Sequence, residues 1–157
     1  MEELLELLVA SGVAALNIIP DRNWNIADAE IRRVKLDNLY AMVRLAEKLD
    51  LPLNIGTEMN APGQKLIDDF DAPELRPVRQ AFLDGAYFIY GHTALQRALG
   101  LGYQSLWAQQ HLPARQERNA FYTRVGRSLP PGKAGLGRLG KFSAQSSPGQ
   151  LLGGLDI

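Results

Sequence analysis

Two carboxylates and one imidazole each follow a short apolar segment of the sequence. Asp21, Glu58 and His92 all lie within two residues of the end of such a segment. If the fold brings these three side chains together, they could hold a divalent metal ion or act as a set of proton donors and acceptors. Each also has an ordinary structural use, because Asp21 suits a turn or a helix cap and His92 suits the start of a helix.

The apolar segments are typical of buried strands, and amphipathic patterns predict helices between them. The predicted strands are residues 14–20, 52–56 and 86–91, and the predicted helices include residues 2–10, 28–49, 104–110 and 116–127. Because continuous apolar strands alternate with helices, we expect an α/β fold with a parallel sheet covered by helices. Right-handed crossovers then bring Asp21, Glu58 and His92 to the edge where such folds bind ligands.

Residues 12–25, 46–60 and 85–93 resemble the PHP (polymerase and histidinol phosphatase) family of metal-dependent phosphoesterases. In that family one strand ends in a Thr-Asp-His motif, the next ends in Gly-x-Glu, and the following strand ends near a metal-binding His. The resemblance covers about half of the chain, roughly residues 12–95. It implies a fold of parallel β/α units that form part of a distorted TIM-like (β/α) barrel, with metal ions bound at the rim.

The resemblance also implies roles for individual residues. Glu58 matches the bridging metal ligand and His92 matches the ligand on the next strand, with zinc, manganese or iron as the expected metal. Asp21 matches the aspartate of the Thr-Asp-His motif, as an outer ligand or general base, and Asn60 matches a position beside the carboxylate. The expected function is a metal-dependent, phosphoesterase-like hydrolase, in which a metal-bound water attacks phosphorus.

The loop after the first predicted strand departs from the family pattern at Arg22. Arginine stays protonated and cannot bind a metal, but its guanidinium could hold a phosphate group, so we predict a catalytic role for Arg22 beside Asp21. Asn23 and Trp24 follow it in the same loop and, with Asn60, are predicted to contact the substrate. The opening His-x-His motif of the family is absent, because the chain has only two histidines.

Two other functions fit the same residues. A non-catalytic binding or assembly module, derived from a barrel enzyme, would hold Asp21, Arg22 and Glu58 together in a structural salt bridge. A metal-free barrel isomerase or lyase would instead use Glu58 and His92 directly as base and acid. The three hypotheses differ in their dependence on metal, so a chelator separates them.

The length of 157 residues bears on how such a barrel could be completed. A closed β/α barrel takes about 250 residues, and three strands alone leave two unpaired sheet edges. We therefore expect residues 1–128 to form a partial barrel domain that joins either a second copy or a missing N-terminal portion of the same barrel. Residues 129–157 are rich in Gly, Ser and Pro and are predicted to form a flexible, disordered tail.

Charge and cysteine content narrow the expected context. Seventeen Lys and Arg balance seventeen Asp and Glu, so the net charge does not indicate nucleic-acid binding. The chain has no cysteine, which excludes a disulfide scaffold and a thiolate zinc site. The first residues are acidic where a signal peptide is basic, and no apolar stretch is long enough to cross a membrane. We expect a cytoplasmic protein that acts on a small-molecule or phosphorylated substrate, away from membranes.

Overall fold

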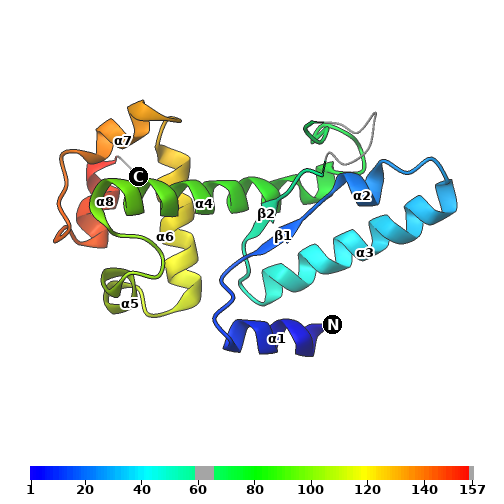
Figure 1. Ribbon diagram of the computed structural model, residues 1–157, viewed down its shortest axis with the longest axis horizontal. Coiled ribbons are helices and arrows are strands. Elements are labelled where there is room, and N and C mark those ends of the chain that lie inside the picture. The colour runs from blue at the N-terminus through cyan, green and yellow to red at the C-terminus, as the bar shows by residue number, and fades with distance from the viewer. Residues whose placement is uncertain (59–65, 156–157) are drawn as a thin grey trace. The chain divides into compact units, whose positions relative to one another are not determined.

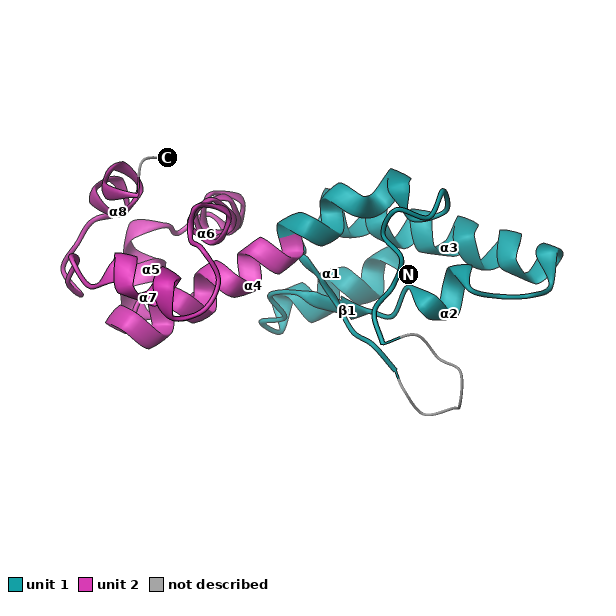
Figure 2. Cartoon of the chain, turned by 90° about the horizontal axis from the view of Figure 1, so that it is seen from above, with its two compact units in different colours: residues 1–84 teal, residues 85–157 magenta. Residues whose placement is uncertain are grey.

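The computed structural model describes residues 1–58 and 66–155, which form α-helices, one 3₁₀ helix and one small sheet (Figure 1). The chain divides into two compact units, unit 1 (residues 1–84) and unit 2 (residues 85–157), which Figure 2 colours separately. Helix α4 (Arg79–Leu99) begins in unit 1 and continues in unit 2. Each unit has its own set of buried side chains and is described by itself.

Unit 1 is built around one β–α–β element. Its parts in chain order are α1 (Glu2–Ala10), β1 (Leu16–Ile18), α2 (Asp21–Trp24), α3 (Ala29–Lys48), β2 (Leu53–Ile55), η1 (Arg76–Val78) and the start of α4. The strands pair in parallel, with Leu16 beside Leu53 and Ile18 beside Ile55. The predicted helix 28–49 is confirmed as α3, and Asp28 caps it by accepting hydrogen bonds from the backbone N–H groups of Glu30 and Ile31 at 2.9 Å.

The sheet of unit 1 buries one face. The Leu and Ile side chains of both strands pack against a core that includes Leu5 of α1, Val43 of α3 and Phe82 of α4. Asn17 and Asn54 lie side by side, and their side chains point to the opposite face from those of Leu and Ile. There the Asn54 Nδ2 donates to the Asn17 Oδ1 at 3.3 Å. The sheet therefore has an apolar face under helices and a polar face bearing asparagines.

Unit 2 is helical in its described residues. It contains the rest of α4 with α5 (Leu106–His111), α6 (Arg115–Ser128), α7 (Lys133–Leu139) and α8 (Pro148–Gly154). Aromatic rings fill its core, with centroids 5.1–5.6 Å apart in the pairs Phe88–Tyr103, Tyr103–Tyr122, Phe121–Tyr122 and Trp107–Phe121. These contacts hold α4, α5 and α6 together within the unit.

The expected TIM-like barrel of parallel β/α units is wrong, because the described residues form only a two-stranded sheet. The predicted third strand, residues 86–91, lies inside α4. Buried positions there recur at Phe82, Gly85, Phe88 and Gly91, a spacing of three residues that belongs to a helix. A short apolar run does not by itself distinguish a buried strand from a buried helical segment, and here it is a helix.

The expected flexible tail is also wrong, since α7 and α8 lie within residues 129–157. Leu139, Leu151 and Leu155 from this segment are at most 2% exposed. Helix α8 begins at a capping box, in which Ser147 and Gln150 bond to each other's backbone N–H groups. A few leucines and good caps order this segment despite its many glycines, because the leucines are fully buried.

Candidate functional site

The predicted site residues of unit 1 meet at the carboxyl ends of β1 and β2. Arg22 belongs to the short helix α2 that follows β1, and Glu58 follows β2. The Arg22 Nε and Nη2 both lie 2.7 Å from the Glu58 Oε2. The two side chains are 51% and 36% exposed, so water screens this ion pair in part. The structure thus has the Arg22–Glu58 part of the salt bridge that the alternative hypothesis of a binding module predicts, although the barrel that was to position these residues does not form.

Asp21 and Asn23 each make a hydrogen bond to a residue four positions away in the sequence. The Asp21 Oδ1 accepts from the Asn25 Nδ2 at 2.9 Å, which closes the single turn of α2. The Asn23 Nδ2 donates to the carbonyl oxygen of Ile19 at 3.0 Å, just beyond the end of β1. Both residues serve as turn and cap residues here, which is the common use of Asp and Asn.

Trp24 is bonded to a buried carboxylate that the sequence placed only in an acidic loop. The Trp24 Nε1 donates to the Asp68 Oδ1 at 2.7 Å, and Asp68 is only 6% exposed. Indole N–H groups that become buried generally find such an acceptor. This hydrogen bond uses the indole N–H of Trp24 within unit 1. It therefore gives Trp24 a structural role that does not require a substrate contact.

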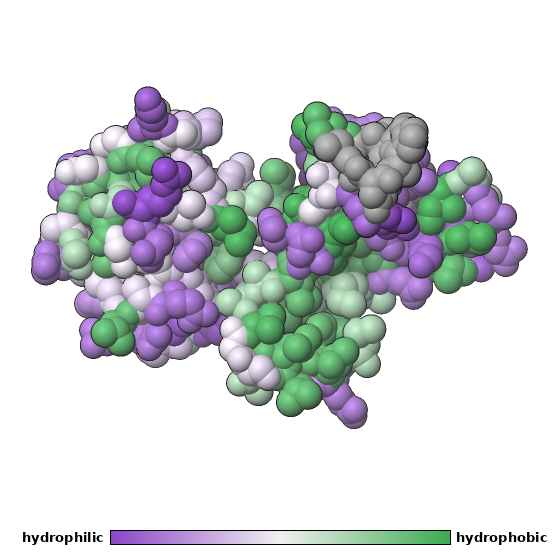
Figure 3. Space-filling model, in the orientation of Figure 1, coloured by the Kyte–Doolittle hydropathy of each residue, from purple (hydrophilic) through white to green (hydrophobic). Residues whose placement is uncertain are grey.

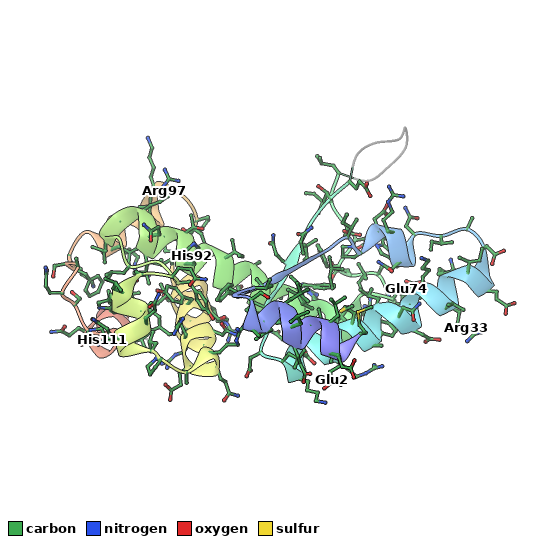
Figure 4. The ribbon with its side chains drawn as sticks, turned by 60° about the horizontal axis from the view of Figure 1, so that its bottom comes forward. Glu2, Arg33, Glu74, His92, Arg97 and His111 are labelled. Atoms are coloured by element: carbon green, nitrogen blue, oxygen red, sulfur yellow. The ribbon has the colours of Figure 1, made fainter. Side chains whose placement is uncertain are left out.

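His92 lies on α4 (Figure 4), in the part of that helix that belongs to unit 2. Glu58 belongs to unit 1. The His92 Nδ1 accepts a hydrogen bond from the backbone N–H of Tyr103 at 2.9 Å. Burial lowers the pKa of His92 from its usual value, which favours the neutral ring that can accept this bond. His92 is therefore a hydrogen-bond acceptor between α4 and the segment before α5, and it does not stand at the end of a strand.

The predicted metal centre at Glu58 and His92 is not formed by the residues that the structure describes. In that part of the chain no three His, Asp or Glu side chains are grouped so that they could hold a metal ion. Asn60, the predicted substrate contact beside Glu58, lies outside the described residues. The described residues therefore form neither the predicted TIM-like barrel nor the predicted metal site.

The outer edge of β1 is a second feature of unit 1. The sequence predicted unpaired sheet edges but did not show which strand edge would be exposed. The Leu16 N–H donates to the Pro52 carbonyl at 3.0 Å and the Gly56 N–H donates to the Ile18 carbonyl at 2.8 Å. Main-chain groups alternate in direction along a strand, so those of Asn17 point away from β2. Asn17 is exposed, and no third strand adjoins β1 in the described sheet.

The outer edge of β2 differs from that of β1. Leu53 carries main-chain groups that point away from β1, yet this residue is only 2% exposed. Neighbouring parts of unit 1 therefore cover that edge at Leu53. Asn17, the residue of β1 whose main-chain groups point outward, is exposed, in contrast to Leu53. Beyond the end of β1, the Asn23 side chain donates to the carbonyl of Ile19.

Helix α1 presents apolar side chains to solvent close in sequence to this edge. Leu4 is 52% exposed and Leu7 is 63% exposed, although Leu5 of the same helix is buried. Figure 3 shows apolar surface gathered over α1. The signal in the sequence is the spread of leucines at residues 4, 5, 7 and 8, which is wider than one helical face needs.

Comparison with protein-family models, with curated proteins and with solved structures finds no match for this chain. Across the described residues no helix has the length and apolar character needed to cross a membrane. The resemblance to the PHP family stays a prediction.

Proposed function

We propose that this protein is a non-catalytic binding and assembly module, whose unit 1 accepts an additional strand from a partner polypeptide along the outer edge of β1. The observation that carries the proposal is that Asn17 is exposed at the outer edge of β1. The outer edge of β2, at Leu53, is buried. An unpaired strand edge offers a row of donors and acceptors on which an extended segment can pair.

The contacts of the predicted site residues support binding over catalysis. Arg22 and Glu58 are bonded to each other, as the hypothesis of a structural salt bridge predicts. Asp21 is bonded to Asn25, and Trp24 to Asp68. Side chains engaged in this way rigidify the loops at the carboxyl ends of β1 and β2, so that the edge of β1 is held in one conformation for a partner.

The small size of the sheet also favours addition of a strand. Two strands of three residues bury little surface, and isolated two-stranded sheets have marginal stability in water. A third strand beside β1 would pair the outward main-chain groups of Asn17. It would also bring the partner's side chains toward the apolar surface of unit 1.

The test uses peptides selected from a random display library on the immobilised full chain, followed by calorimetric titration of the selected peptides. Asn17→Pro removes the outward N–H without touching the β1–β2 ladder, so we expect it to weaken peptide binding by about tenfold or more. Asn17→Ala is the matched control, because it keeps the N–H and removes only the side chain. We expect Asn17→Ala to bind as the parent chain does.

Two results would overturn the proposal. The first is a failure to select binding peptides, or binding that Asn17→Pro leaves unchanged while circular dichroism shows that both variants are folded. The second is a rise of several degrees in Tm on addition of Mn²⁺ or Zn²⁺ that Glu58→Ala abolishes, because ligand binding to the folded state stabilises it. That second result would support the metal-dependent hydrolase instead.

A further inference from the structure

Two exposed apolar strips in unit 1 have the same spacing. On α1 the strip consists of Leu4 and Leu7, which are 52% and 63% exposed. On α3 it consists of Ile31 and Val34, which are 53% and 47% exposed. In both helices the two apolar residues are three positions apart, so each strip forms a short ridge along one side of its helix.

Charged side chains of opposite sign lie beside the two strips, Glu3 on α1 and Lys35 on α3. Helix α1 contains three glutamates and no lysine or arginine, and Glu3 lies one turn before Leu7 on the same side of the helix. The first turns of α3 contain both signs of charge, with Glu30 and Asp37 on either side of Arg33, which pairs with them at 4.0 and 3.6 Å. The exposed Lys35 lies one turn after Ile31. The charge complementarity between the two strips therefore consists of one pair, Glu3 on α1 and Lys35 on α3.

The strips do not cover each other within one chain. The Glu2 carboxylate of α1 lies 2.5 Å from the Lys48 Nζ, at the C-terminal end of α3. Helix α1 therefore lies along the second half of α3, and the first half of α3 extends past it (Figures 1 and 2). Figure 4 likewise shows Arg33 far along α3 from Glu2 at the start of α1.

We propose that unit 1 also binds a second copy of this chain, in which α1 of each copy packs on the first half of α3 of the other. Leu4 and Leu7 of one copy then meet Ile31 and Val34 of its partner, and Glu3 faces Lys35. A two-fold axis makes this contact twice, so both strips of both copies are covered. This inference goes beyond the proposed strand addition, because it concerns helices α1 and α3 and not the edge of β1.

A second copy fits these strips better than a membrane surface does. Anionic lipids attract basic amphipathic helices, whereas α1 carries only glutamates among its charged side chains. An unrelated protein would need to reproduce both the spacing and the charge of α3. A second copy of this chain carries the α3 strip itself, and it is present wherever α1 is present.

Analytical ultracentrifugation of the full chain over a concentration series tests the proposal. We expect a monomer–dimer equilibrium that Leu7→Asp weakens by about tenfold or more. Leu106→Asp is the matched control, because Leu106 is 74% exposed on α5 of unit 2, and it should leave the equilibrium unchanged. Circular dichroism checks that both variants fold.

A charge exchange makes the test specific for the contact between Glu3 and Lys35. Glu3→Lys and Lys35→Glu should each weaken self-association about tenfold, because each homodimer then holds two pairs of like charges. An equal mixture of the two variants should restore dimers, because both contacts in the heterodimer again pair opposite charges. No such rescue is expected for a mixture in which one variant is Leu7→Asp.

The outcomes separate this inference from the proposed function. A chain that stays monomeric throughout the series overturns the second copy as partner, and so does a dimer insensitive to Leu7→Asp and to the charge exchange. Peptide binding to the Leu7→Asp variant, measured with and without Asn17→Pro, then decides the proposed function independently. Rescue by charge exchange supports the dimer whatever the peptides do.

Discussion

The Nε and Nη2 of Arg22 both lie 2.7 Å from the same carboxylate oxygen of Glu58, across 36 residues of sequence. This ion pair connects the helix that follows β1 to the segment that follows β2. The two charged groups thereby pair with each other, where the sequence predicted Glu58 as a metal ligand and Arg22 as a phosphate-binding guanidinium. The pair links the segments that follow the carboxyl ends of the two strands. At the outer edge of β1, Asn17 is exposed.

The first prediction concerns the energetic weight of this pair. Arg22→Met and Glu58→Gln should each lower the free energy of unfolding by less than about 1 kcal/mol, because both side chains are substantially exposed and water screens their attraction. Urea unfolding followed by circular dichroism measures the change, and the double variant gives the coupling energy. A loss above about 3 kcal/mol would show that the pair is effectively buried in solution.

Local patterns in the sequence were sufficient to predict the main helix and both strands of unit 1. The helix 28–49 was predictable because its apolar positions recur over five turns and Asp28 supplies a cap. The strands at Leu16–Ile18 and Leu53–Ile55 lie inside the predicted segments 14–20 and 52–56. The adjacency of Arg22 and Glu58 follows from that parallel pairing alone, and it does not need a barrel.

The failures have one physical origin, which is that burial depends on partners far away in sequence. Residues 86–91 are apolar enough for a strand, and only the packing of Phe88 against Tyr103 and against Tyr122 of α6 shows that they are helical. The Trp24–Asp68 hydrogen bond spans 44 residues, and nothing in the local sequence marks Asp68 as buried. The order of the C-terminal helices likewise comes from tertiary contacts.

The second prediction tests that order through Leu151. This side chain of α8 is fully buried, so Leu151→Ala should lower the free energy of unfolding by about 2–5 kcal/mol through lost burial and a residual cavity. Leu106→Ala, at a residue that is 74% exposed, should change it by less than about 0.5 kcal/mol. Equal and negligible effects of both substitutions in urea unfolding would mean that residues 129–157 are disordered after all.

The third prediction is a pH dependence set by His92. Burial lowers its pKa in the folded chain below the usual 6.5, so the unfolded chain binds a proton more readily. The stabilisation is fully present above the unfolded value of 6.5 and is lost as the pH falls through the lowered pKa of the folded state. The free energy of unfolding should therefore be smaller at about pH 5.5 than at about pH 7.5.

His92→Asn isolates this contribution, because the asparagine amide oxygen can accept from the Tyr103 N–H without titrating. The pH dependence of that variant between the same two conditions should be flatter than that of the parent chain. His111→Asn, on the exposed end of α5, is the control and should keep the parental slope. Identical slopes for the parent and His92→Asn would contradict the assignment.

The last prediction concerns the crossing of α4 and α6, which depends on two glycines. A Cβ at Gly91 would overlap the backbone carbonyl oxygen of Tyr122, and a Cβ at Gly126 would overlap that of Tyr87. Backbone atoms in packed helices cannot move aside cheaply, so Gly91→Ala and Gly126→Ala should each destabilise the protein by about 1–3 kcal/mol. The gain in helix propensity from Gly to Ala is smaller than this cost.

Gly137 in α7 provides the matched control for these two substitutions. A Cβ there would meet nothing within 4 Å, so Gly137→Ala should stabilise the protein by about 0.5–1 kcal/mol through reduced freedom of the unfolded chain. Thermal unfolding of the three variants gives the comparison directly. Opposite signs for Gly91 and Gly137 would establish that α4 and α6 touch through their backbones, whereas a neutral or stabilising Gly91→Ala would require the two helices to be farther apart.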